Sequence, residues 1–544
     1  MDCDPKYWLR VWLLAMSSRI EKCFCIPIAH GACPRLTLLF NSLIDCKVMK
    51  KNQKARKKEV LNLLKKQKIR SIEQIDAYKL SPCHPHSAGI DLGSTENYVA
   101  LNPEIAAEMD FPIVHTFGTT TPQHEACRDL LLRCGIRDVC MESTGIYWIN
   151  LHYVLTQAGI SVCLVNPKMF RMVPGRKTDV LDCQWLQTLH FYGLVRGSFI
   201  PEEHVRQLRT FMRLREKLIQ DRSRYVQRMQ KAMVEMNLML VNVLDDVTGK
   251  TGMAIIEAIL AGERDPKKLA SLRDGRCKHT EEDIEEAMTG IYKDDQLVAL
   301  RINHNIWRGL QAQIDELDLE IGRLLQTFKD APEREKAPKD DVPQEGQAAG
   351  NAEGTENGKE KEKKKRKTKA SKNDIKAGID LEKELLRICG ADLTSLTGIQ
   401  ANATLQIVAE VGTDLSAFPT KEDFTSFLGF SPHNKITGGR LISAKTDRKK
   451  SYAAQAFKKV IPSIIKGKSS LSAFYHRING KKGTAVAITA TCRKLAERYY
   501  DVVTKGEDYI EYGEELYQQK IKERELKYLK KLAKKHNLEI KEAV

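Results

Sequence analysis

The stretch SAGIDLGSTENYVALN, from Ser87 to Asn102, decides the fold, because it contains two β-rich runs in succession. A third such run, PIVHTFGT, follows at 112–119. Three successive strands followed by helix, strand, helix, strand and helix indicate an α/β domain with a mixed sheet, which we place at 86–200. The later elements expected in it are helices at 122–135 and 146–159 and strands at 137–143 and 161–167.

The last helix of this domain is predicted in PGRKTDVLDCQWLQTLHFYGLV, at 174–195. Asp179 and Asp182 lie three residues apart near its start, so their carboxylates point the same way. Arg176 and Lys177 directly precede them. Taken alone, two acidic residues at this place would merely complement the positive end of the helix dipole.

Two further carboxylates end strands of the predicted sheet. Asp91 ends the first strand in GIDLGS, and Glu142 ends the fourth in CMESTGIYW. Four hard oxygen ligands that converge on one sheet edge would bind Mg²⁺ or Mn²⁺ rather than zinc. Two such ions can activate a nucleophile and stabilise a leaving oxygen in phosphodiester chemistry. Arg176 and Lys177 would then contact phosphate.

The loop GIDLGST allows a second interpretation, because it also resembles the first phosphate loop of actin-like ATPases and sugar kinases. Such an enzyme needs a second glycine-rich phosphate hairpin after a later strand. The only Gly-Gly pair in the chain, Gly438-Gly439, lies in the far domain and follows no D-x-G strand. The sequence therefore disfavours a kinase.

The composition favours a polyanionic partner. Among 544 residues, 88 Lys and Arg against 71 Asp and Glu give a net charge of +17, for which nucleic acid is the simplest partner. No segment is long enough to span a membrane. The cysteines in the body of the chain stand singly in apolar runs, where a free thiol packs as a small hydrophobe. We therefore expect a reducing, cytoplasmic setting without membrane association.

Residues 1–85 are expected to form a leader and a basic helical segment. Met49 opens MKKNQKARKKEVLNLLKKQ and is a plausible natural start, so residues 1–48 are interpreted as upstream sequence without a role. They contain one candidate zinc cluster, whose spacing is poor because such sites usually combine two separated ligand pairs. Its potential ligands are Cys23, Cys25, His30 and Cys33.

Beyond the α/β domain the chain changes character several times. Residues 201–329 are predicted to be helical, with an Arg-rich helix followed by one that has coiled-coil spacing. The apolar seam of this second helix needs a partner, which is either the earlier helix or a second subunit. Alternatively, the seam is an apolar stripe on an ordinary bundle helix. A disordered charged linker is predicted at 330–375, a second compact domain at 381–512 and a charged helical tail at 513–544. The seam residues are Ile302, Ile306, Leu310, Ile314, Leu317, Ile321, Leu324 and Phe328.

Two motifs of the second domain point to phosphate. LTGIQANATLQIVAEVG predicts two helices around a Gly-containing turn. This arrangement either presents backbone amides to a phosphate or is an ordinary helical hairpin packed in a small core. NKITGGRLISAK places Thr437 and Ser443 on either side of a Gly-Gly turn. A hydroxyl among cations and flexible backbone suits a nucleophile that attacks phosphate, although a solvated basic face would look similar. The neighbouring cations are Arg440, Lys445, Arg448, Lys449 and Lys450.

With these motifs, the sequence resembles the transposases of insertion-sequence family 110 over 86–199 and 391–500. The resemblance is carried by GIDLGS, MESTGIYW, NPKMFRMVPGRKTDVLDCQWL and LTSLTGIQANATLQIVAEVG, in that order. It implies an RNase H-like (RuvC-like) DEDD domain, a helical coiled-coil insertion and a mainly α C-terminal transposase domain. It also implies that the metal-binding residues are Asp91, Glu142, Asp179 and Asp182.

The activity implied by the resemblance is excision and insertion of a mobile element by DNA strand exchange. A structured non-coding RNA that pairs with donor and target DNA would guide it. The resemblance further implies a homo-oligomer, a dimer or tetramer joined through the coiled coil, in a prokaryotic cytoplasm and on the nucleoid when bound to DNA.

One position departs from the family pattern. Thr437 stands where the family usually has serine before Gly-Gly, and its extra methyl group restricts the hydroxyl and crowds its approach to phosphate. Ser443 is the alternative nucleophile. Two other functions stay open: a RuvC-class nuclease that hydrolyses branched DNA without a covalent step, and a catalytically inert nucleic-acid-binding relative.

Overall fold

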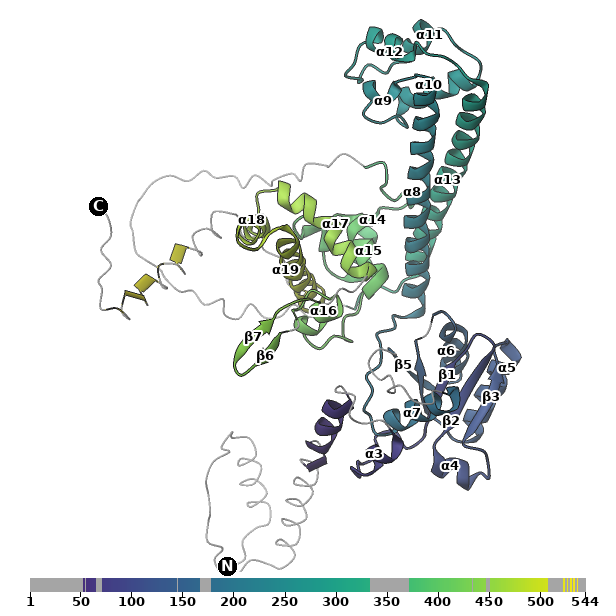
Figure 1. Cartoon of the computed structure of the whole chain (residues 1–544), viewed down its shortest axis with the longest axis vertical. Helices are drawn as coiled ribbons and strands as arrows, with labels where there is room; N and C mark the ends of the chain where they lie inside the picture. Colours follow the sequence, from purple (N-terminus) through teal and green to yellow (C-terminus); the bar gives the residue numbers. More distant parts are fainter. Residues whose placement is uncertain are drawn as a thin grey trace, which may run out of the picture. The chain divides into compact units, whose positions relative to one another are not determined.

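The computed structural model divides into two compact units, residues 1–199 and 200–544 (Figure 1). The predicted leader before residue 49 and most of the predicted linker lie outside the described residues. Among the described residues, no helix combines the length and the apolar character needed to cross a membrane. The structure describes 71–506 with gaps at 144, 167–177, 333–370, 433 and 447–450, and short pieces within 52–64 and 522–536.

Unit 1 is built on five strands: β1 Ser87–Leu92, β2 Glu96–Leu101, β3 Val114–Gly118, β4 Asp138–Glu142 and β5 Ser161–Val165. They form one sheet in the order β3-β2-β1-β4-β5. β2 pairs antiparallel with β1 and β3, whereas β4 pairs parallel with β1 and β5. The mixed sheet and all five predicted strands are therefore confirmed.

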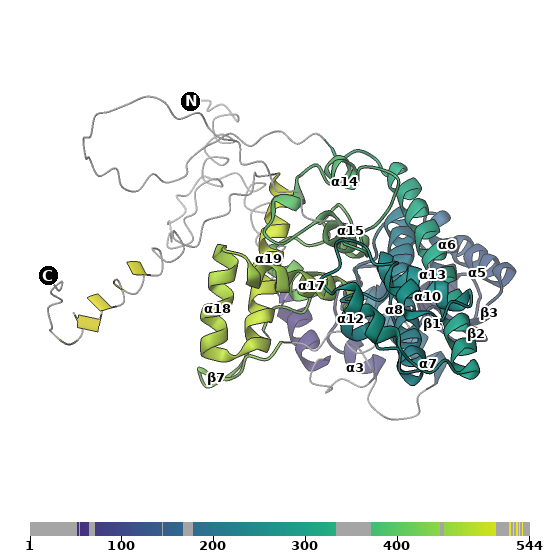
Figure 2. The same cartoon turned by 90° about the horizontal axis from the view of Figure 1, so that it is seen from above.

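The helices of unit 1 are α3 Ile72–Asp76, α4 Pro103–Glu108, α5 Thr121–Arg133, α6 Trp148–Gln157 and α7 Asp179–Phe191. Figures 1 and 2 show α7 on one face of the sheet and α5 and α6 on the other. The central strand β1 is buried on both faces for this reason. The sequence did not predict α4, whose first turn is capped by the Asn102 side chain.

Helix α7 packs very closely on β1, and Gly89 permits this approach. A Cβ atom at residue 89 would lie 2.3 Å from both the backbone oxygen of Cys183 and the backbone nitrogen of Gln187. No real side chain tolerates such a contact, so only glycine lets α7 cross β1 at this height. Gly89 therefore sets the spacing between the strand that carries Asp91 and the helix that carries Asp182.

A small apolar cluster ties the chain before the sheet to the later turns of α7. Val60 and Ile75 are fully buried and pack with Trp185 and Leu189 of α7. This cluster makes part of the predicted basic leader segment a component of the folded unit. It packs on the side of α7 that faces away from β1.

In unit 2, two long helices, α8 Glu203–Glu235 and α13 Asp294–Gln326, run side by side (Figure 1). We call this pair the stalk. The Arg215 guanidinium on α8 donates to the carboxylate of Asp318 on α13, with Nε and Oδ1 2.5 Å apart, and both side chains are nearly fully buried. Because a buried charge is stable only when it is paired, this ion pair fixes the register of the two helices.

The predicted seam of α13 is covered only in its later half. Ile314 and Ile321 are buried, whereas Ile302 and Ile306 are 53% and 38% exposed. Leu300 is buried instead, in an apolar core at the end of the stalk. Positions two residues apart point to opposite sides of a helix, so burial of Leu300 turns Ile302 outward. Helix α8 alone therefore does not complete the predicted coiled coil.

Four short helices cap the stalk: α9 Leu240–Val243, α10 Lys250–Leu260, α11 Pro266–Ala270 and α12 Glu281–Met288. Ile255, Ile256 and Ile259 of α10 are fully buried against Met233 of α8 and Leu300 of α13. The stalk and its cap thus share one apolar core.

The rest of unit 2 is mainly helical, as the resemblance implied, with one two-stranded hairpin. Phe424, Phe457 and Tyr499 are buried together and bring the helices into one core. The helices are α14 Leu381–Cys389, η2 Leu393–Ser395, α15 Ala401–Val411, α16 Lys421–Phe427, α17 Tyr452–Lys466, α18 Ser470–Lys482 and α19 Thr484–Lys505. The hairpin is β6 Lys435–Thr437 and β7 Arg440–Ser443.

This helical part is anchored to the stalk by charge and by close backbone packing. Arg213 of α8 donates from Nε and Nη2 to the two carboxylate oxygens of Glu410 on α15, at 2.8 Å each. A Cβ atom at Gly322 of α13 would lie 2.1 Å from the backbone oxygen of Ala377. The stalk therefore serves as the scaffold on which the C-terminal helices are placed.

Candidate active site

The carboxyl ends of β1 and β4 carry two of the predicted carboxylates. Asp91 lies two residues after Gly89, so its side chain points to the same face of the sheet, toward α7. Ile90 pairs with Met141 across the parallel strands, which sets Glu142 beside Asp91. Both carboxylates are partly buried. The sheet thus presents them side by side at one edge.

The first turn of α7 carries the other two. Asp179 is exposed and Asp182 is partly buried. The side chain of Thr178 caps this turn by accepting a backbone hydrogen bond at 3.3 Å. Because α7 crosses β1 in the next turn, at Cys183, its first turn lies over the end of β1 that carries Asp91. The fold therefore gathers all four predicted carboxylates at one sheet edge.

Strand β2 adds two residues that sequence reasoning missed. Tyr98 pairs with Asp91 across β1 and β2, so both side chains point to the same face. The Tyr98 hydroxyl donates to Oε2 of Glu96 at 3.0 Å, and this hydrogen bond raises the pKa of Tyr98, helped by the negative charges of Glu96, Asp179 and Asp91. The two-residue period of β2, which places residues 96 and 98 on the carboxylate face, is the signal that could have found them.

The donor set at this edge fits a hard divalent cation, because every predicted ligand atom is a carboxylate oxygen. In the described part of the chain, however, no three of these four carboxylates bring oxygens within 4.8 Å of one another. The four carboxylates therefore lie at one edge of the sheet, but their oxygen atoms do not converge on a single point. Arg176 and Lys177, predicted to contact phosphate beside them, lie outside the described residues.

The predicted nucleophiles lie on the β6–β7 hairpin. Thr437 ends β6 and pairs with Arg440 across a two-residue turn. Gly438 and Gly439 form this turn with φ values of +55° and +75°. Two successive positive φ values suit glycine, since other residues would be strained in both positions. The Gly-Gly pair therefore folds the hairpin back directly after Thr437.

The two competing hydroxyls differ in their surroundings. Thr437 is exposed at the tip of the hairpin, next to the exposed Arg440. Ser443 is half-buried near the base, and its Oγ accepts a hydrogen bond from the backbone N–H of Lys445 at 3.4 Å. Arg440 begins β7, Lys445 follows the end of β7 by two residues, and both side chains are exposed. The remaining predicted cations, at 448–450, lie outside the described residues.

Two family models match the two regions that carry these residues. A transposase model of the DEDD type of the IS110 group matches residues 88–238. A second model, described as "Transposase IS116/IS110/IS902 family", matches residues 390–476, which include the hairpin. The chain belongs to the IS110 family of transposases. No curated protein matches it.

Family membership fixes the general activity. As an IS110-family transposase, the protein binds DNA and is an enzyme that cleaves DNA and transfers strands. The DEDD type of its first domain implies dependence on a divalent metal. Among the described residues, the carboxylate edge of unit 1 offers donor atoms that fit such a metal.

The LTGIQ motif of the transposase folds differently from its predicted pair of helices. Residues 396–400 form a turn without a helix, after the 3₁₀ turn η2 has ended at Ser395, and Gly398 in this turn has a φ of +78°. A Cβ atom at Gly398 would lie 2.7 Å from a side-chain carbon of Ile464 on α17. Most of α15 is buried. The motif thus serves packing within the helical core more than it presents backbone amides to a phosphate.

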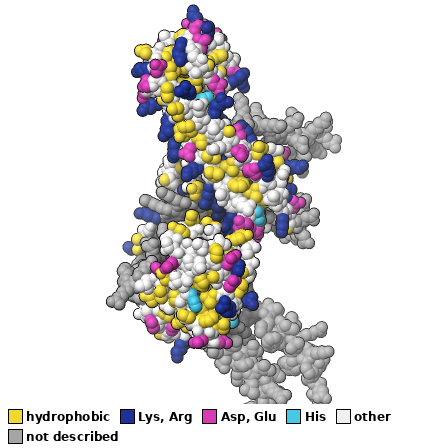
Figure 3. Space-filling view, turned by 90° about the vertical axis from the view of Figure 1, so that its right-hand side faces the viewer, with side chains coloured by type: hydrophobic (Ala, Val, Ile, Leu, Met, Phe, Trp, Pro, Cys, Tyr) yellow, Lys and Arg dark blue, Asp and Glu magenta, His cyan; other side chains and the backbone are white. Residues whose placement is uncertain are grey.

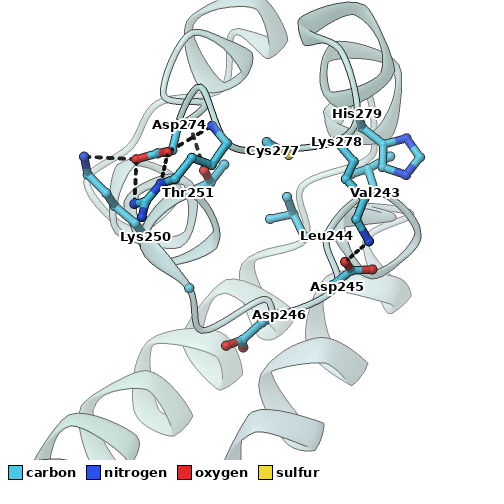
Figure 4. A pocket seen from close by; sticks show the side chains of 12 residues that line it. Val243, Leu244, Asp245, Asp246, Lys250, Thr251, Asp274, Cys277, Lys278 and His279 are labelled. Carbon is cyan, nitrogen blue, oxygen red and sulfur yellow. Dashed lines mark hydrogen bonds and ion pairs between the residues drawn. The ribbon is translucent and has the colours of Figure 1, made fainter. Parts of the chain in front are cut away.

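The cap of the stalk contains a cleft of about 320 Å³ (Figure 4). Lys250 and Arg276 both contact the carboxylate of Asp274, with nitrogen to oxygen distances of 3.2 and 2.9 Å. Lys278 contacts Asp245 at 2.6 Å. The cations of the cleft are therefore paired with acidic residues of the same cleft, and we assign no part of the transposase chemistry to it.

Proposed function

We propose that this transposase excises and inserts a mobile DNA element by metal-dependent strand cleavage and exchange. The observation that carries the proposal is the convergence of β1, β4 and α7, which gathers Asp91, Glu142, Asp179 and Asp182 at one edge. These four side chains would hold Mg²⁺ or Mn²⁺. When bound, the ions supply activation of the attacking oxygen and stabilisation of the leaving oxygen.

The electrostatics of the edge support a role for bound cations. Glu96 lies on the same side of the sheet and adds a fifth carboxylate to the four. Phosphate would be repelled from such a group of negative charges unless cations neutralise it. In this proposal, Arg176 and Lys177, which precede α7 in the chain, are the side chains that help to neutralise the carboxylates and attract phosphate.

Thr437 is the proposed nucleophile of strand exchange. Its hydroxyl attacks a backbone phosphate, breaks one P–O bond and releases the cleaved strand as a hydroxyl end. Attack by the hydroxyl of another strand then restores the DNA and frees Thr437. Exposure at the tip of a glycine turn supports this choice over Ser443, whose hydroxyl is half-buried and already accepts a hydrogen bond.

The proposed partners are element and target DNA together with a structured guide RNA. The net charge of +17 supports binding to two nucleic acids, and Arg440 and Lys445 supply exposed cations beside the nucleophile. Guidance by RNA rests on the resemblance in sequence to the family. Phosphate contacts of this kind would be sensitive to salt and independent of the DNA sequence.

The stalk is the proposed site of homo-oligomerisation. Val298, Ile302 and Ile306 follow one another at steps of four on α13 and are 44%, 53% and 38% exposed. Residues four apart lie on one side of a helix, so the three form an apolar stripe that α8 does not cover. Figure 3, which views the α13 side of the stalk, shows apolar side chains gathered along it. A second stalk would bury this stripe.

Removal of single metal ligands tests the proposed function. Asp91→Ala and Asp182→Asn should each reduce DNA cleavage by about 10³-fold or more, because the ligands support several kcal/mol of transition-state stabilisation. Binding of DNA and RNA should stay within about threefold of the wild type, because their contacts lie elsewhere. Cleavage and strand exchange are measured on DNA with element ends, with Mg²⁺, with chelator and with guide RNA.

Asp129→Asn, which changes an exposed aspartate on α5, is the matched control and should leave cleavage unchanged. Wild-type recombination in either ligand variant would remove the carboxylate edge from the mechanism. Cleavage that persists in chelator would exclude the metal. Metal-dependent cleavage without strand exchange would favour a hydrolytic nuclease over a recombinase.

A further inference from the structure

A group of sulfur and nitrogen donors lies under α7, behind the carboxylates. Cys140 of β4 and Cys163 of β5 are directly paired across parallel strands, so their side chains point to one face of the sheet. Cys140 also pairs with Gly89, which identifies that face as the one covered by α7. His190 lies at the end of α7. The two Sγ atoms and one ring nitrogen of His190 all lie within 4.8 Å of one another.

The group is largely buried and holds a polar atom without a hydrogen-bond partner among the described residues. Cys140 is fully buried, Cys163 is half-buried, and only 4% of His190 is exposed. Nε2 of His190 is buried and forms no hydrogen bond with any residue that the structure describes. Buried polar atoms nearly always have a partner, so this nitrogen needs an explanation. The ring of His84 stacks on that of His190 at 4.3 Å and shields it on one side.

We propose that Cys140, Cys163 and His190 form a binding site for a zinc ion. Two sulfur atoms and one imidazole are donors that select zinc over magnesium, whereas the carboxylate edge of the same domain has the opposite preference. Zinc bond lengths of about 2.3 Å to sulfur and 2.0–2.1 Å to nitrogen place tetrahedral ligands roughly 3.5–3.8 Å apart. The three donors need only a small inward movement to reach that spacing.

The sequence conceals this site, because its two cysteines are 23 positions apart in the chain and each stands alone in an apolar run. They meet only through the register of β4 and β5. The alternative interpretation is that both thiols pack as small hydrophobes beside Val165 and Leu186. Packing, together with the contact between Cys163 and the His190 ring, explains the two thiols, but Nε2 of His190 still has no hydrogen-bond partner among the described residues.

The zinc ion would connect three elements that also position the carboxylates. Cys140 lies two residues before Glu142 on β4, and His190 lies eight residues after Asp182 on α7, roughly 12 Å along the helix. Binding at this place would hold the later half of α7 against β4 and β5. Its role would be to position the helix rather than to contact DNA.

Cobalt titration of the full chain tests the proposal. The metal-free protein is titrated with Co²⁺ in excess Mg²⁺, and thiolate-to-cobalt charge-transfer absorption is recorded in the ultraviolet. Cobalt bound to carboxylates lacks this absorption, so cobalt at the carboxylate edge does not contribute to the recorded signal. We expect saturation at one cobalt per chain and complete displacement by one equivalent of Zn²⁺.

Single variants assign the ligands. Cys140→Ser, Cys163→Ser and His190→Gln should each weaken cobalt binding by about 100-fold or more, since loss of a direct ligand costs at least as much as loss of its hydrogen-bond partner. Cys127→Ser, a buried cysteine of α5 outside the group, is the matched control and should change nothing. The double variant Cys23→Ser/Cys25→Ser controls for the cysteine cluster before residue 49 and should also retain the absorption.

Three results would overturn the proposal: no sulfur absorption in the wild type, absorption that survives Cys163→Ser, or absorption that disappears in the Cys23→Ser/Cys25→Ser variant. X-ray absorption of the zinc-loaded wild type gives a test that does not depend on the folding of variants. It should show two sulfur ligands at about 2.3 Å and at least one imidazole. Any other number of sulfur ligands contradicts the site.

Discussion

The carboxylate edge of unit 1 and the β6–β7 hairpin of unit 2 hold their proposed functional residues in opposite ways. Asp91 and Glu142 end strands of a five-stranded sheet, and α7 is pressed onto that sheet at Gly89. Thr437 instead ends a three-residue strand that has one partner strand, and its side chain is exposed. One region fixes its side chains through a buried core, and the other presents its side chain to solvent.

The hairpin is also apolar where it is exposed. Ile436, Leu441 and Ile442 are 63%, 57% and 68% exposed. Isolated two-stranded hairpins are only marginally stable in water, so such side chains favour a covering partner. The comparison teaches that the proposed metal ligands are positioned by the fold itself, whereas we infer that the proposed nucleophile acquires its final position when DNA or another chain covers the hairpin.

The largest effect on the fixed region is expected from Gly89→Ala. The new methyl group would lie 2.3 Å from backbone atoms of α7 and force the helix away from β1. Overpacking of this kind costs about 3 kcal/mol, and a shift of roughly 1 Å in catalytic groups lowers cleavage about 100-fold. Denaturant unfolding and DNA cleavage measure the two effects. Gly309→Ala, whose Cβ would meet open space, should cost nothing. Equal stability of both variants would contradict the account of α7.

A smaller effect, confined to function, is expected from Leu441→Ser on the hairpin. Because Leu441 is exposed, the free energy of unfolding should change by less than about 0.5 kcal/mol. Strand exchange should fall about tenfold, since one covered apolar side chain contributes about 1.5 kcal/mol. Leu386→Ser, at a similarly exposed leucine of α14, is the control and should retain exchange. Equal losses in both variants would mean that the hairpin needs no covering partner.

The smallest effect on folding and on DNA cleavage is expected from changes to the apolar stripe of α13, which should alter self-association instead. Ile302→Glu combined with Ile306→Glu should leave folding within about 0.5 kcal/mol of the wild type, since both side chains are exposed. Self-association, measured by sedimentation, should weaken about tenfold or more because charges would enter an apolar interface. Leu319→Glu, exposed elsewhere on α13, is the control. Unchanged association would place the subunit contact outside this stripe.

The sheet was predictable because its signals are local. Runs such as SAGIDLG and SVCLVNP are apolar over a strand's length, and their order along the chain restricts the topology. The four carboxylates could be predicted for the same reason, since each lies at the end of a recognised element. The close crossing of α7 at Gly89 could not be predicted, because it depends on backbone contacts between residues almost 100 positions apart.

Other features escaped prediction because they depend on pairing in space. Tyr98 joins the carboxylate edge through the register of β1 and β2, and Cys140 meets Cys163 through that of β4 and β5. Along the sequence, each of these residues is an ordinary apolar or aromatic position. The half-covered seam of α13 escaped for a related reason, since burial of Leu300 in the cap's core turns Ile302 outward.

Trapping a covalent protein–DNA adduct tests the central claim most directly, because the adduct requires both the carboxylate edge and the hairpin hydroxyl. The wild type, Thr437→Ala, Thr437→Ser, Ser443→Ala and Asp182→Asn are each incubated with a suicide DNA substrate, Mg²⁺ and guide RNA. We predict an adduct in the wild type and in Ser443→Ala, and none in Thr437→Ala or Asp182→Asn. Thr437→Ser should form it about 3- to 10-fold faster, because serine lacks the crowding methyl group. An adduct that survives Thr437→Ala and disappears in Ser443→Ala would contradict the choice of nucleophile, and cleavage without an adduct in any variant would contradict the covalent mechanism.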